Sequence, residues 1–124
     1  MEHILVINAR KNIPSLENNF IMEDKKKYLE EEYDYLKAGI KSAKLDYHSF
    51  VFSTIRNGKP ELRTVILREV NTRAPSITFH SDQRSKKLTD IGLNHEVSAL
   101  FYDRSRRVQL RLSGKAKIEK DTTV

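Results

Sequence analysis

The chain has 124 residues, of which 38% are hydrophobic and 32% charged, and it contains no cysteine and no tryptophan. This length and apolar content indicate one small globular domain and argue against a collagenous, low-complexity or fully disordered chain. The composition excludes disulfides and thiolate metal sites, and the four histidines lack metalloprotease-type spacing, so we expect no metal site.

The charge is unevenly distributed along the chain. Residues 1–62 carry as many acidic as basic groups, so the whole net charge of +6 lies in residues 63–124. This asymmetry indicates an anionic partner, either a nucleic-acid backbone or a phosphorylated small molecule, or else a solvated basic surface. Because no apolar run approaches the roughly 18 to 20 residues of a membrane span, we expect a cytoplasmic protein. A core this small also favours homodimerisation.

The first third of the chain predicts an arm and then a helix. Residues 1–21 look like an extended arm, to which we assign no function, and residues 22–124 are expected to form the single domain. Between Met22 and Leu45, apolar residues recur every three or four positions, which predicts an amphipathic helix with a charged, solvated opposite face. The apolar positions are Leu29, Tyr33, Leu36, Ile40 and Ala43.

The rest of the chain predicts short antiparallel strands with one helical interruption. Alternation over 50–55, the turn residues Asn57-Gly58 and a second strand over 62–70 predict a hairpin. Further strands are expected over 76–81, 97–102 and 108–118, with a short helix over 84–93 between the third and fourth strands. We therefore expect a mainly-β (α+β) fold built as a small antiparallel barrel or closed sheet.

A basic, hydroxyl-rich segment follows the third predicted strand. Residues 80–87 read His-Ser-Asp-Gln-Arg-Ser-Lys-Lys and lead into the predicted helix. A helix N-terminus offers unpaired N–H groups, and Arg and Lys add donors and charge, so this composition indicates a phosphate site. The alternative is an ordinary capped helix, although basic residues in a first turn are unfavourable without an anion.

Two arginines lie in the second strand of the predicted hairpin. Arg63 and Arg68 are five positions apart, so in one continuous strand they point to opposite faces, and Arg63 shares its face with Val65 and Leu67. Such a strand would present a cation to a phosphate and an apolar edge to a flat ring. Alternatively, the arginines protect an edge strand from aggregation.

Four segments together resemble the flavin-binding half of the pyridoxamine 5′-phosphate oxidase family. They are residues 63–68 (Arg-Thr-Val-Ile-Leu-Arg), 79–87, 97–102 and 109–116 (Gln-Leu-Arg-Leu-Ser-Gly-Lys-Ala), and they match in order and spacing across residues 46–120. The resemblance implies an antiparallel split β-barrel that binds FMN at a homodimer interface. It therefore implies a flavoprotein, an FMN-dependent oxidoreductase acting on a small-molecule redox substrate that the motifs do not identify.

The resemblance also implies roles for individual residues. Arg63 matches the family's phosphate-contacting arginine, and Lys86 and Lys87 match its Arg-Lys clamp, with lysine in place of arginine at the first position. Gln109 matches the glutamine that hydrogen-bonds the flavin ring. His80 matches an aromatic position beside the flavin. It could act as an acid or base, but a ring-edge contact or a satisfied surface histidine is favoured, so no catalytic residue is assigned. The full set expected to contact FMN is Arg63, Val65, Ile66, Leu67, Arg68, His80, Ser81, Arg84, Ser85, Lys86, Lys87 and Gln109.

The sequence leaves two alternative functions open. The family's full-length oxidases continue well beyond the matched segments, so we expect a C-terminally short domain, and a cofactor-less scaffold is one alternative. The other is a nucleic-acid-binding module, which is disfavoured because only Tyr102 accompanies its basic residues, whereas single-strand binders interleave several stacking rings. That basic stripe would consist of Arg104, Arg106, Arg107, Arg111, Lys115 and Lys117.

Overall fold

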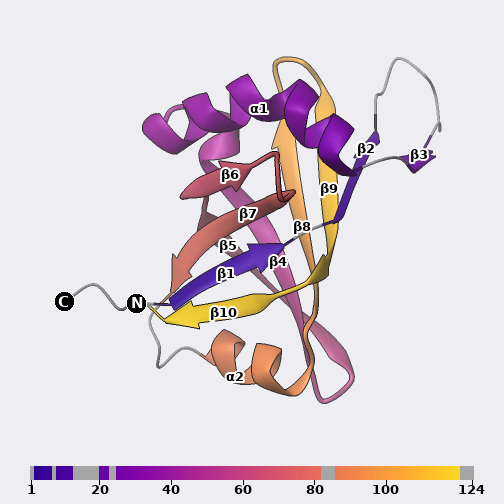
Figure 1. Ribbon diagram of the computed structural model, residues 1–124, viewed down its shortest axis with the longest axis vertical. Helices are drawn as coiled ribbons and strands as arrows, with labels where there is room; N and C mark the ends of the chain where they lie inside the picture. The colour runs from indigo at the N-terminus through magenta and orange to yellow at the C-terminus, as the bar shows by residue number, and fades with distance from the viewer. Residues whose placement is uncertain (1, 7, 13–19, 23–24, 82–85, 121–124) are drawn as a thin grey trace.

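The computed structural model describes residues 2–6, 8–12, 20–22, 25–81 and 86–120. In this part of the chain, two antiparallel sheets pack together, and helices α1 and α2 lie at opposite ends of the molecule (Figure 1). The two sheets do not close into a single hydrogen-bonded barrel among the described residues. The fold is therefore the expected mainly-β α+β fold, arranged as a split barrel.

The larger sheet has six strands in the order β3-β2-β9-β8-β4-β5. Its hairpin β4–β5 turns at Asn57 and Gly58, whose φ angles of 52° and 76° are those of the turn that the Asn-Gly pair predicts. The strands are β2 (Asn8–Asn12), β3 (Phe20–Met22), β4 (Ser49–Arg56), β5 (Lys59–Ile66), β8 (Glu96–Asp103) and β9 (Val108–Lys115).

The smaller sheet has four strands in the order β10-β1-β7-β6, so β1 and β7 are its central strands. Its strands are β1 (Glu2–Val6), β6 (Glu69–Asn71), β7 (Ser76–Ser81) and β10 (Lys117–Lys120).

The strands β1 and β2 lie within the segment predicted as an arm, and both are built into the sheets. β1 pairs with both β7 and β10, and β2 pairs with both β3 and β9. The residue pattern within one β-strand does not reveal such pairing, because β7, β9 and β10 all lie far from these strands in the sequence. The N-terminal strands thus contribute to both sheets.

Two strands predicted as continuous are divided between the sheets. The strand expected over 62–70 ends at Ile66, and Glu69–Asn71 forms β6 in the smaller sheet. The strand expected over 108–118 ends at Lys115, and Lys117–Lys120 forms β10, again in the smaller sheet. In both cases buried and exposed side chains keep alternating where the chain passes from one sheet to the other, because a buried residue, Leu67 or Ala116, lies at the junction. Consequently the strands are not one continuous meander.

Helix α1 (Lys25–Lys41) is shorter at both ends than the helix expected over 22–45. It is followed by the short 3-10 helix η2 (Asp46–His48), which folds back against α1. Gly39 permits this approach, because a Cβ at that position would lie 2.6 Å from the backbone carbonyl carbon of Tyr47. Tyr33 is only partly buried and Ala43 is exposed, so the buried face is rotated relative to the predicted one.

The core lies between the sheets and is centred on aromatic rings. The Phe50 ring stacks on Phe101 with centroids 4.6 Å apart, and Phe52 meets Phe79 edge-on at 4.7 Å. The predicted helix over 84–93 is observed as α2 (Lys86–Leu93), between the third and fourth predicted strands as expected. Residues 84 and 85 lie outside the described residues.

Candidate functional site

Strand β5 contacts β7, and helix α2 contacts β4, the partner of β5 in the hairpin. Arg63 lies directly opposite Phe52 in the β4–β5 pair, and its guanidinium carbon is 5.9 Å from the centre of the Phe52 ring. Phe52 in turn packs on Phe79, which precedes His80 in β7. The fold therefore brings the expected phosphate arginine towards the end of β7, which leads to the basic segment that sequence analysis singled out.

Arg63 is a partly buried cation without an ion pair among the described residues. Its Nη1 donates a 3.3 Å hydrogen bond to the carbonyl oxygen of Phe52. Burial lowers the pKa of the guanidinium below its ordinary value, although the nearby Asp90 and Glu61 carboxylates raise it. An anion bound here would restore the interactions that the charge loses on burial.

Strand β5 also forms an edge of the larger sheet. Among the described strands, β5 pairs with β4 alone, so its outer edge has unpaired backbone groups that a planar heterocycle can bind. Val65 lies on the inner face of the sheet and is partly buried, whereas Ile66 lies on the outer face and is 40% exposed. These two expected flavin neighbours therefore flank the edge from both sides.

The last two residues of the expected Arg63–Arg68 segment belong to the sheet crossing. The Leu67 side chain is fully buried in the core, and its N–H donates to the carbonyl of His48. Arg68 is exposed and its N–H donates to the carbonyl of Thr78. Arg63 and Arg68 do not lie in one strand as expected, because β5 ends at Ile66.

The basic segment is described in part. His80 is partly buried and Ser81 is 6% exposed, both at the end of β7. Lys86 is exposed and Lys87 partly buried, in the first turn of α2. Arg84 and Ser85, also expected to contact FMN, lie outside the described residues.

Gln109 lies on the opposite face of the larger sheet from Arg63. The cross-strand partners of Arg63 run through Phe52 and Ala99 to Leu112, all on the inner face. Because side chains alternate along β9, Gln109 is on the outer face, directly opposite Tyr102. Within one chain, these two expected flavin ligands do not converge.

The outer face of the larger sheet carries exposed apolar side chains around a shallow cavity. Leu62 is 67% exposed, Tyr102 45% and Val51 36%. The cavity has a volume of about 300 Å³ and is lined by Val51, Ser53, Leu62, Ser98, Leu100 and Arg111, among others. An apolar patch over several strands is typical of a protein interface.

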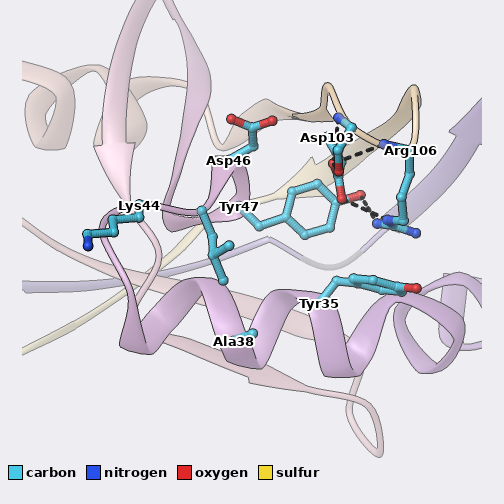
Figure 2. A pocket seen from close by; sticks show the side chains of 9 residues that line it. Tyr35, Ala38, Lys44, Asp46, Tyr47, Asp103 and Arg106 are labelled. Carbon is cyan, nitrogen blue, oxygen red and sulfur yellow. Dashed lines mark hydrogen bonds and ion pairs between the residues drawn. The ribbon is translucent and has the colours of Figure 1, made fainter.

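A second cluster, which sequence analysis did not single out, lies at the other end of the molecule. Figure 2 shows the Arg106 side chain over the ring of Tyr35 and close to Tyr47. Arg106 forms ion pairs with Glu32 and Asp103, each at 2.7 Å, and its guanidinium carbon is 3.4 Å from the Tyr35 ring centre. The Tyr47 hydroxyl donates to Glu32, and burial together with that carboxylate raises the pKa of the phenol.

This cluster borders a cavity of about 380 Å³ between α1, η2 and the β8–β9 turn. The carboxylates at the cavity are already neutralised, since Asp103 is paired with Arg106 and Asp46 with Arg104 at 3.4 Å. The arrangement joins α1 to the turn, which indicates a structural role. It also withdraws Arg106 from the basic stripe of the nucleic-acid alternative, whereas the Arg104 side chain is 81% exposed.

Sequence analysis also missed two buried carboxylates. Asp90 in α2 is 4% exposed and accepts hydrogen bonds from Arg56 at the end of β4. Glu32 had a signal in the sequence, because it follows Leu29 by three positions and precedes Leu36 by four on the apolar helix face. Asp90 had no comparable signal, since its partner is fixed by tertiary packing.

Comparison with known proteins decides the family. A model of the family "Pyridoxamine 5′-phosphate oxidase, FMN-binding domain" matches residues 30–120. The chain belongs to this family. Within it, a pyridoxine/pyridoxamine 5′-phosphate oxidase of Psychrobacter cryohalolentis is 39% identical over 66 residues, which is 52% of this chain and 30% of that protein. One of Psychrobacter arcticus is 39% identical over 64 residues, 51% of this chain and 29% of that protein.

The matches to these two oxidases thus span less than a third of their length. In this member of the FMN-binding-domain family, no helix among the described residues is long and apolar enough to cross a bilayer. The described residues also contain no group of three His, Asp or Glu side chains that would hold a metal ion.

Proposed function

We propose that the chain is an FMN-binding flavoprotein and serves as an FMN-dependent oxidoreductase. The observation that carries the proposal is Arg63, a partly buried cation without a carboxylate partner among the described residues, beside an open sheet edge. The family match supports FMN as the anion that this arginine receives. FMN, when bound, supplies reversible electron uptake, while the protein supplies phosphate capture and ring orientation.

The residues near Arg63 fit a phosphate-bearing ligand. Thr54 lies on the same face of β4 as Phe52, its side chain is fully buried, and its hydroxyl has no hydrogen-bond partner among the described residues. Lys86 and Lys87 add positive charge from the first turn of α2. In this assignment Arg63 and the two lysines bind the phosphate, and the edge of β5 beside Val65 and Ile66 receives the ring.

We further propose that the protein acts as a homodimer with the flavin at the interface. Arg63 and Gln109 are on opposite faces and three strands apart in the sheet, a lateral separation of about 14 Å. A flavin that contacts both Arg63 and Gln109 must therefore contact Arg63 of one copy and Gln109 of a second copy. The exposed Val51, Leu62 and Tyr102 on the outer face supply the apolar surface for that copy.

Flavin retention tests the binding proposal. The purified protein is mixed with FMN, desalted and examined for flavin absorption, and Kd values are measured for FMN and riboflavin. Arg63→Ala should weaken FMN binding by about 10- to 100-fold, the effect of losing a charged hydrogen bond, and leave riboflavin binding nearly unchanged. Arg73→Ala, which removes an exposed cation from the turn between β6 and β7, is the matched control.

A folded wild-type protein that retains no FMN would overturn the proposal. Salt-sensitive oligonucleotide binding by such a colourless protein would then favour the nucleic-acid alternative. Once FMN is retained, pyridoxamine 5′-phosphate is the first substrate to test, because the two matched relatives are named for it. Bleaching of the flavin by a substrate in the absence of oxygen would establish the oxidoreductase step. A cytoplasmic location stays a prediction of the sequence.

A further inference from the structure

The Asp90 carboxylate in α2 is held by a forked contact from Arg56. Arg56 Nε donates to both carboxylate oxygens at 3.0 and 3.2 Å, and Nη2 donates to Oδ2 at 3.0 Å. The Asp90 side chain is 5% exposed, whereas that of Arg56 is 34% exposed. A planar guanidinium bound through two nitrogens fixes orientation as well as distance, so the pair fixes α2 against the end of β4.

This contact joins the two parts of the proposed phosphate site. Asp90 follows Lys86 by four positions and Lys87 by three, so all three lie along one side of α2. On β4, Arg56 is on the same face as Phe52, which lies opposite Arg63 in β5. The pair therefore sets the position of the two lysines relative to Arg63.

The pair also determines which arginine is available to an anion. Arg56 is neutralised by Asp90 and has a second carboxylate, Glu61, at 3.6 Å. Arg63 forms no ion pair with Asp90 or Glu61, although both carboxylates are close enough to raise the pKa of its guanidinium. Neutralising Arg56 leaves Arg63 as the arginine of this hairpin that is free to bind a phosphate.

We propose that Arg56 and Asp90 are positioning residues that assemble the phosphate-binding cations and so make the site selective for FMN over riboflavin. This inference rests on the proposed FMN function. Neither residue is assigned a contact with the flavin. They affect phosphate binding indirectly. The pair fixes the position of α2, and it leaves Arg63 able to bind an anion.

The direction in which Asp90→Asn changes FMN affinity distinguishes a positioning role from a purely electrostatic one. Asp90→Asn removes a negative charge near the phosphate, so a purely electrostatic role predicts tighter FMN binding. Positioning predicts the reverse, because the neutral amide loses the ionic fork and α2 is no longer fixed. We expect FMN binding to weaken by about 10-fold, with riboflavin binding changed by less than about 2-fold.

The experiment measures Kd for FMN and for riboflavin on the full chain by quenching of flavin fluorescence. Arg56→Met should reproduce the effect of Asp90→Asn, and Arg56→Lys, which keeps the charge but not the fork, should fall between Arg56→Met and wild type. Glu32→Gln is the matched control, because it breaks a buried ion pair at the other end of the molecule. It should leave the ratio of the two Kd values unchanged.

The outcomes distinguish this inference from the proposed function. If wild type binds no FMN, the proposed function itself fails. If wild type binds FMN and Arg63→Ala loses the preference over riboflavin, while Asp90→Asn and Arg56→Lys keep it, only the positioning role is overturned. If Asp90→Asn does not fold, the comparison of Arg56→Lys with Arg56→Met decides by the same ratio.

Discussion

Glu32 and Arg106 are separated by 74 positions in the chain, and their side chains form a double hydrogen-bonded ion pair. The Arg106 nitrogens lie 2.7 and 3.0 Å from the two Glu32 oxygens, and the glutamate side chain is 1% exposed. Helix α1 is thereby joined to the turn between β8 and β9. The charge on the apolar face of the helix is thus paired with an arginine from that distant turn.

Breaking this pair should be costly. Glu32→Gln leaves Arg106 without its most buried partner, and removal of one member of a buried pair costs about 3–5 kcal/mol of unfolding free energy. Urea denaturation at neutral pH measures the loss. The double variant Glu32→Leu with Arg106→Met removes both charges and should recover much of it. A loss below about 1 kcal/mol in the single variant would contradict a buried, intact pair.

Gly39 and Gly92 should respond in opposite directions to alanine. In an open helix position, alanine is favoured over glycine by about 1 kcal/mol. Gly92 has open space where a Cβ would lie, so Gly92→Ala should stabilise the protein or leave it unchanged. Gly39→Ala should destabilise it, because the added Cβ would lie 2.6 Å from the Tyr47 backbone and push η2 from α1. Thermal unfolding of both variants checks the contrast.

Asp103 should contribute to acid sensitivity. Burial alone would raise the pKa of its carboxyl, but hydrogen bonds from Arg106 and Ser105 outweigh burial and hold the pKa below its ordinary value. A lowered folded-state pKa stabilises the fold fully above the unfolded-state pKa of about 3.9, and this stabilisation is lost as the pH falls through the folded-state pKa. Asp103→Asn should therefore flatten the dependence of stability on pH below about 5.

Urea midpoints measured across this acidic range for wild type and variant test the point. Asp34→Asn, which removes the same charge from an exposed position on α1, is the control. An unchanged slope in Asp103→Asn would show that other carboxylates account for the acid response.

The apolar outer face should govern the oligomeric state. Leu62→Glu places a charge on a side chain that is 67% exposed on the outer face proposed as the interface, so the variant should sediment as a monomer at concentrations where wild type is a dimer. Leu93→Glu alters a side chain that is 85% exposed at the end of α2, away from that face, and should remain dimeric. A monomeric wild type would contradict the proposed dimer.

Local features of the fold were predictable, whereas pairings between distant segments were not. The Asn57-Gly58 turn and the alternation in β8 and β9 are encoded by adjacent residues, and both are observed. Nothing in the pattern around Leu67 predicts that the chain leaves one sheet there, because a buried leucine suits a continuous strand equally well. The placement of β1 and β2 in different sheets depends on partners that local alternation cannot specify.

The candidate site likewise contains residues that could be predicted from the sequence and residues that could not. Arg63 could be selected from its strand and from the resemblance, and it lies in the β4–β5 hairpin, which contacts β7 and α2. Arg56 and Asp90 could not, because 34 positions separate them and neither belongs to a local motif. Gln109 could be selected by type, but its position on the opposite face follows only from the observed register.

The pairing of β1 has a consequence for the order of folding. This strand spans Glu2–Val6, yet its two neighbours are β7 and β10, and β10 ends at Lys120. β1 precedes both partners in the chain, and roughly 110 residues separate it from β10, so the closure of a long loop opposes their pairing. We therefore expect the smaller sheet to be completed late, and until β10 joins it, β1 presents an unpaired edge that the strand of another chain could join.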